Sequence, residues 1–146
     1  MPRVRDVPTR RLRAVPVDPS LVHSELAEER RLAVEALGRL ADAPAIELLV
    51  GCLLDPDVDV TYDAASALAD IGTDRAIDGL LEVAGDERCD VARRVVAVSA
   101  LGHLRVVPPR VIDALRTLHA RGDRGDGGDP WLVGTARQTL LWLERD

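Results

Sequence analysis

Apolar residues recur along the chain with the spacing of amphipathic helices. In four segments an Ala is followed four residues later by a Leu, and three residues after that by another aliphatic residue, so that all three share one helical face. The stripes begin at Ala33, Ala64, Ala97 and Ala136. Their offsets of 31, 33 and 39 residues predict a helical unit that is repeated along the chain.

Each of the first three stripes is followed by a break and then by a second helical pattern. The breaks contain Pro44, Gly72 and the pair Pro108 and Pro109, and we expect Gly72 to adopt the left-handed conformation of a C-terminal helix cap. The second patterns contain Ile46, Ile77 and Ile112. The unit is therefore an A helix, a tight turn, a B helix and a second turn, which makes the fold class all-α.

This reading divides the chain into an N-terminal arm and one repeat domain, residues 18–146. Three prolines interrupt the arm, so we expect it to be extended or disordered. The predicted segments are the arm at 1–17, repeats at about 25–56, 57–88 and 89–121, a flexible insert at 122–129 and a capping helix at 130–145.

The sequence between Ala33 and Asp57 contains the pattern Ala-x-x-Ala-Leu-Gly-x-Leu-x-Asp, followed by Leu-x-Asp-Pro-Asp. A looser copy runs from Ala64 to Asp86. The pattern resembles the short HEAT-like repeats of the phycobilisome-lyase type. The resemblance implies a right-handed α-solenoid of about three helix pairs, with B helices on a concave wall where partners bind. Chromophore lyases, adaptor proteins and enzyme subunits all use such repeats, so it indicates function only weakly.

Charge is unevenly distributed over the 146 residues, whose net charge is −6. Residues 1–17 have a net charge of +4, and residues 18–146 have 14 Arg and 24 acidic residues, a net of −10. All 19 basic residues are Arg, a usage typical of a GC-rich genome. The arm has one acid, Asp6, and its basic residues are Arg3, Arg5, Arg10, Arg11 and Arg13.

Aligning the three B helices on their Ile residues places acidic side chains in one column. The column contains Glu47, Asp78 and Asp113, with Glu82 one turn after Asp78, and no basic residue interrupts it. On a concave wall it would attract a positively charged peptide or protein surface. The alternative is that these acids occupy ordinary solvent-facing positions near helix N-termini, where they complement the helix dipole.

The arm and two tryptophans are further candidates for contact with partners. The arm could dock on an acidic partner or on a second copy of the chain, which would give a homodimer. An acidic body without interleaved aromatic residues argues against nucleic acid. Trp131, beside the insert, is an interface candidate, whereas we expect Trp142 to cap the end of the solenoid and Tyr62 to lie on the surface.

Residues suited to catalysis or metal binding are few. Helical-repeat hydroxylases with a di-iron site use His-Glu pairs, but here Ser24, Leu104 and Ala120 follow the three histidines. Asp55, Asp57 and Asp59 imitate the start of a calcium loop that then lacks its required Gly and Glu, so a repeat turn is expected. Cys52 and Cys89 have no neighbouring His or Lys that would activate a thiol.

We therefore predict a non-catalytic protein-protein interaction scaffold with no cofactor or metal, whose acidic concave face binds a basic segment of a partner. The first alternative is an enzyme or a lyase-like or chaperone-like accessory subunit, and the second is nucleic-acid binding through the arm. Because no apolar run is long enough for a membrane helix, we expect a cytoplasmic protein.

Overall fold

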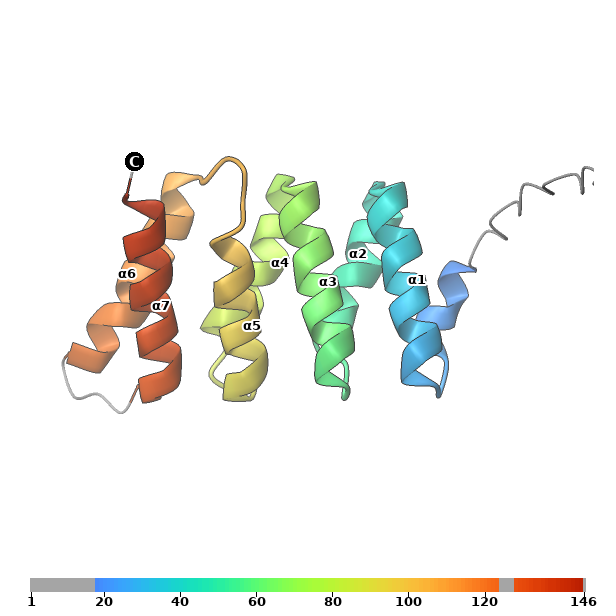
Figure 1. Ribbon diagram of the computed structural model, residues 1–146, viewed down its shortest axis with the longest axis horizontal. Helices are drawn as coiled ribbons and strands as arrows, with labels where there is room; N and C mark the ends of the chain where they lie inside the picture. The colour runs from blue at the N-terminus through green and yellow to red at the C-terminus, as the bar shows by residue number, and fades with distance from the viewer. Residues whose placement is uncertain (1–17, 124–127, 146) are drawn as a thin grey trace, which may run out of the picture.

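The computed structural model describes residues 18–123 and 128–145, and within these residues helices joined by turns and loops are the only regular secondary structure, without strands. A short 3-10 helix precedes seven α-helices (Figure 1). The elements are η1 (Pro19–His23), α1 (Ala27–Leu40), α2 (Ala43–Cys52), α3 (Val58–Ile71), α4 (Asp74–Gly85), α5 (Val91–Leu101), α6 (Pro109–Asp123) and α7 (Pro130–Leu143).

The helices form two layers that run along the long axis of the molecule (Figure 1). The A layer consists of α1, α3, α5 and α7, and the B layer consists of α2, α4 and α6. In Figure 1 the chain runs upward through each A helix in front and downward through the next B helix behind. Each pair lies to the left of the one before it, which makes the solenoid right-handed. We call the outer surfaces of these layers the A face and the B face.

The predicted Ala and Leu stripe forms the centre of the A layer. The four Ala residues are fully buried, and the Leu residue that follows each is at most 6% exposed. Small residues let neighbouring helices approach closely: a Cβ added to Gly38 of α1 would lie 3.3 Å from the Cβ of Ala67 of α3. The third position of the stripe is less regular, because Leu104 is buried but Leu40 is 55% exposed at the end of α1.

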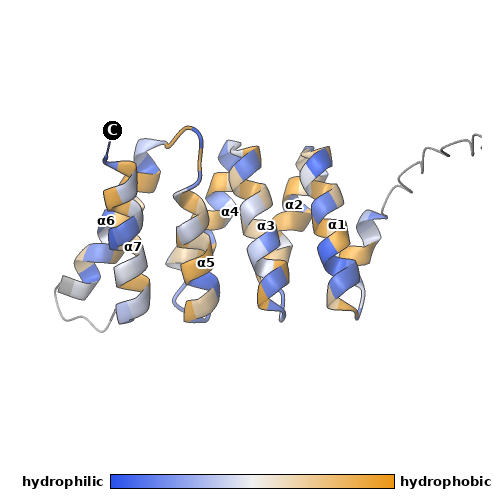
Figure 2. Cartoon of the chain, in the orientation of Figure 1, coloured by the Kyte–Doolittle hydropathy of each residue, from blue (hydrophilic) through white to orange (hydrophobic). Residues whose placement is uncertain are grey.

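Side chains at the predicted breaks cap the helices. Asp42, Asp57, Thr73 and Asp90 each accept a hydrogen bond from a backbone N–H in the first turn of α2, α3, α4 and α5. Gly72 ends α3 with φ of 64°, which confirms the predicted left-handed cap. Hydrophobic and hydrophilic residues alternate around the helices (Figure 2), as expected of helices with one buried side.

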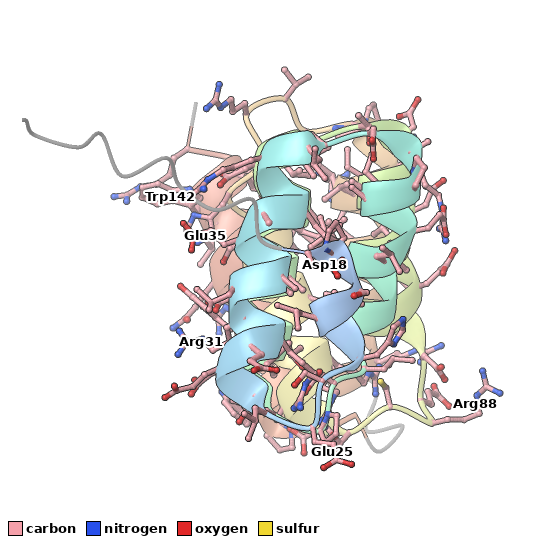
Figure 3. The ribbon with its side chains drawn as sticks, turned by 90° about the vertical axis from the view of Figure 1, so that its right-hand side faces the viewer. Asp18, Glu25, Arg31, Glu35, Arg88 and Trp142 are labelled. Atoms are coloured by element: carbon pink, nitrogen blue, oxygen red, sulfur yellow. The ribbon has the colours of Figure 1, made fainter. Side chains whose placement is uncertain are left out.

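The N-terminal end of the described chain is closed by η1, which lies between α1 and α2 when the solenoid is viewed from that end (Figure 3). Asp18 accepts a hydrogen bond of 2.9 Å from the Ser20 N–H, and Pro19 follows it at the start of the helix. Val22 is 8% exposed and joins the core. The arm, residues 1–17, lies outside the described residues.

Candidate functional site

The four acids of the predicted column lie on the B face. Glu47 extends from α2, Asp78 and Glu82 from α4, and Asp113 from α6, and all four are exposed. The repeat alignment thus places these side chains on the same layer of the molecule.

Two arginines of the same face pair with three of these carboxylates. Arg75 of α4 reaches α2, where its Nε lies 2.6 Å and its Nη2 3.1 Å from the two carboxylate oxygens of Glu47. Its Nη1 lies 3.2 Å from Glu82. Arg110 of α6 reaches back to α4, where its Nη2 lies 3.2 Å from Asp78. The column itself contains no basic residue, but Arg75 and Arg110 stand beside it and pair with three of the four acids.

Arg110 also bonds Asp74 at 3.1 Å, so each of the two arginines is shared between two carboxylates. We call this set of seven residues the B-face ladder: Glu47, Asp74, Arg75, Asp78, Glu82, Arg110 and Asp113. Five carboxylates against two guanidinium groups leave it with a net charge of −3. The Arg75 guanidinium lowers the pKa of Glu47 by hydrogen bonding to its carboxylate.

The A face carries all the aromatic side chains of the chain. Tyr62 of α3 is 59% exposed, and Trp131 and Trp142 of α7 are 60% and 63% exposed. The expectation that Trp142 caps the solenoid is therefore wrong, because its position on α7 corresponds to the outward positions of Asp70 on α3 and Arg39 on α1. Trp142 points outward on the same side as Arg31 and Glu35 of α1 (Figure 3).

The Asp-Pro-Asp turn between α2 and α3 has a structural role. Asp55 is 8% exposed and accepts hydrogen bonds of 2.8 and 2.9 Å from Nε and Nη2 of Arg30 on α1. Arg93 of α5 donates from Nε to the Asp55 backbone carbonyl at 3.0 Å. One turn thus ties together three A helices.

The described residues contain no group of three His, Cys, Asp or Glu side chains that could hold a metal ion. Burial raises the pKa of the Cys52 thiol to about 11, and burial also raises the pKa of Cys89, with Asp86 and Asp90 adding to the effect. Neither thiol has the lowered pKa of a catalytic nucleophile.

Two parts of the sequence prediction fall on residues that the structure does not describe. The basic side chains of the arm, Arg3, Arg5, Arg10, Arg11 and Arg13, are among them, as is the middle of the insert, residues 124–127. None of the described helices is both long and apolar enough to cross a membrane.

Comparison with known proteins identifies the repeat. A family model described as HEAT repeats matches residues 19–100. A search of curated proteins finds no match. Among solved structures, the chain is similar to human deoxyhypusine hydroxylase in complex with glycerol, with 25% sequence identity and a TM-score of 0.67. The similarity covers 88% of this chain but only 40% of the hydroxylase. The match of the family model over more than half of the sequence shows that the chain belongs to the HEAT repeat family.

Proposed function

We propose that this protein is a non-catalytic scaffold that binds a basic segment of a partner protein on its B face. The observation that carries the proposal is the surplus of carboxylates in the B-face ladder. HEAT repeats form extended surfaces suited to binding other proteins, and a charged face of this kind steers oppositely charged partners toward itself. Under this proposal the B helices line the concave wall of the solenoid.

The pairing within the ladder suggests how a basic segment would bind. Arg75 is shared between Glu47 and Glu82, so an incoming cation can take one carboxylate while Arg75 keeps the other. Asp78 and Asp74 share Arg110 in the same way. Asp113 has no ion pair among the described residues and offers a further carboxylate. The cations of the partner can therefore pair with carboxylates of the ladder while Arg75 and Arg110 each keep one ion pair.

The test is charge reversal on the B face. The triple variant Glu47→Lys, Asp78→Lys and Asp113→Lys is compared with a control that changes the net charge equally away from this face, Glu25→Lys, Asp59→Lys and Glu144→Lys. A partner captured with the unmodified chain is purified, and its affinity for each variant is measured by titration calorimetry. We expect the B-face variant to lose on the order of tenfold in affinity and the control to lose little. Equal losses, or no loss in either variant, would contradict the proposal.

The arm and Trp131 are the secondary contacts of this proposal. The arginines of the arm would bind an acidic partner or a second copy of the chain, and the exposed indole of Trp131 would pack against the partner. Light scattering with gel filtration tests the homodimer through its mass, and Trp131→Ala tests the indole through partner affinity.

The similarity to deoxyhypusine hydroxylase favours one alternative, an enzyme or an accessory subunit of the lyase-like or chaperone-like kind. Native mass spectrometry and elemental analysis of the purified chain distinguish it from a scaffold. A stoichiometric small molecule or metal ion would support the enzyme alternative. A mass equal to that of the polypeptide would support the scaffold.

A further inference from the structure

A groove runs between α1 and α3 on the A face. Its volume is about 740 Å³. The groove is open because Gly38 and Ala67, which face each other between the two helices, have almost no side chain to fill the space. It lies on the opposite side of the solenoid from the B-face ladder, since α1 and α3 belong to the A layer.

The groove combines uncovered apolar side chains with surplus carboxylates. Leu32 is 50% exposed and Tyr62 is 59% exposed, and both line it. Four carboxylates and two arginines line it as well: Glu28, Glu35, Asp63, Asp70, Arg31 and Arg39. Arg31 bonds Asp63 at 2.7 Å and Arg39 pairs with Glu35, so Glu28 and Asp70 are the two without an ion pair among the described residues. A ligand with both basic and aliphatic side chains would complement this wall.

We propose that residues 1–17 of the same molecule occupy this groove. They have a net charge of +4, opposite to that of the groove. Their larger aliphatic side chains are interspersed with the arginines and suit the apolar patch of Leu32 and Tyr62; they are Val4, Val7, Leu12, Val15 and Val17. Three prolines favour an extended conformation, which suits a groove that runs along two helices.

The arm is long enough to reach the groove. Asp18 lies at the end of the solenoid between α1 and α2, whereas Arg31 and Glu35 lie on the outer side of α1 (Figure 3). The arm therefore has to pass around one helix, whose diameter with side chains is about 10–12 Å. Seventeen extended residues span about 56 Å. Covalent attachment gives the arm an effective concentration on the order of millimolar at such a distance, which favours its own groove over that of another copy.

The B face is a less suitable receptor for the arm. Four of the five carboxylates of its ladder are shared with Arg75 and Arg110, and none of the large exposed hydrophobic side chains of the described residues lies on α2, α4 or α6. The groove offers both negative charge and exposed apolar side chains to the arm, whereas the B face offers only negative charge. In the isolated protein the arm is therefore held on the A face, and an acidic partner has to compete for it.

Limited tryptic digestion of the full-length chain tests the proposal, because trypsin cleaves after the arginines of the arm. Cleavage after Arg10, Arg11 and Arg13 is followed by mass spectrometry in the unmodified chain and in the variant Glu28→Gln and Asp70→Asn. The control is Glu47→Gln and Glu82→Gln, which neutralises two exposed carboxylates on the B face. Loss of two contacts should speed cleavage of the arm about fivefold in the groove variant only. Equal cleavage rates in all three proteins would overturn the proposal.

A photo-crosslinker distinguishes attachment within one molecule from exchange between molecules. The probe is a benzoylphenylalanine placed at Leu12 of the full-length chain. We expect crosslinks to residues 28–39 or 62–70 in a product with the mass of one chain. Crosslinks to α2, α4 or α6, or a product with the mass of two chains, would overturn the proposal. The proposed binding of a basic partner segment rests on the B-face carboxylates, and the charge-reversal variants test it separately.

Discussion

Two Arg-carboxylate pairs of this protein share the same chemistry but not the same surroundings. Arg30 and Asp55 form a bidentate ion pair near one end of the A helices, and their side chains are 13% and 7% exposed. Arg75 and Glu47 form the same contact on the B face, with side chains 41% and 57% exposed. The first pair lies among three A helices, and the second lies at the surface between two B helices.

Because of this difference in burial, we expect the buried pair to affect mainly stability and the exposed pairs to affect mainly binding. When one partner of a buried pair is removed, the remaining charge has neither solvent nor a counter-charge, and the protein loses stability. When one partner of an exposed pair is removed, water and salt ions solvate the remaining charge, and the loss of stability is small. We therefore expect the A-layer pair to contribute to the stability of the fold. The B-face pairs can exchange with the charges of a partner, as the proposed function requires.

The largest expected effect is on the buried pair. Asp55→Ala removes the acceptor for Arg30 and should lower the free energy of unfolding by about 3 kcal/mol. Urea denaturation followed by circular dichroism measures this change. The matched substitution Glu47→Ala on the B face should move the midpoint much less. Equal shifts for the two variants would show that burial does not distinguish the pairs.

The second prediction concerns apolar contact between the B helices. A Cβ on Gly79 of α4 would lie 2.6 Å from Cγ2 of Val50 on α2, whereas a Cβ on Gly51 would meet no atom within 4 Å. Gly51→Ala should stabilise the protein by about 0.5 kcal/mol through its helix preference, and Gly79→Ala should destabilise it by about 1 kcal/mol. Thermal unfolding of both variants checks the difference. If Gly79→Ala is also stabilising, Val50 can move aside without a packing cost, and this contact does not limit the approach of α2 and α4.

The third prediction sharpens the role of the ladder. Arg75→Gln releases Glu47 and Glu82 from their shared guanidinium, so the B face should bind a basic peptide about threefold more tightly. Fluorescence anisotropy with a labelled nona-arginine peptide at low salt measures the affinity. The control is Arg116→Gln, which removes an exposed arginine paired with Glu144 outside the ladder. A similar gain in both variants would indicate an effect of net charge alone.

The smallest expected effect is on pH dependence. Arg75 holds the pKa of Glu47 below its ordinary value of 4.5, so the unfolded chain takes up this proton more readily than the folded one. The contribution of Glu47 to stability is present above pH 4.5 and is lost as the pH falls through the lowered pKa. Glu47→Gln should therefore flatten the curve of thermal midpoint against pH below pH 4.5. Parallel curves for the two proteins would contradict this assignment.

Sequence reasoning located the column of Glu47, Asp78 and Asp113 because residues at equivalent positions of a repeat lie on the same layer. It missed Arg75 and Arg110, which stand elsewhere in the repeat. An arginine side chain is long enough to cross to the neighbouring helix, and its direction depends on helix spacing. A search for basic residues within one turn of the column would have found both.

The groove of the A face was also missed, for a different reason. Gly38 and Ala67 contribute to the stripe of small residues that the sequence shows, but that pattern indicates close packing and says nothing of a hollow above it. The hollow depends on the rim side chains, among them Tyr62 and Leu32, whose positions follow from the packing of α1 against α3.

The sequence by itself determined the all-α repeat, the helix caps such as Gly72 and the opposite charges of arm and body, because periodicity, capping and charge are local properties. Only the tertiary structure decided which charges are neutralised. It buried Asp55 against Arg30, placed Arg75 over Glu47 and left Trp142 exposed, because burial and pairing depend on helices that are distant in sequence and adjacent in space.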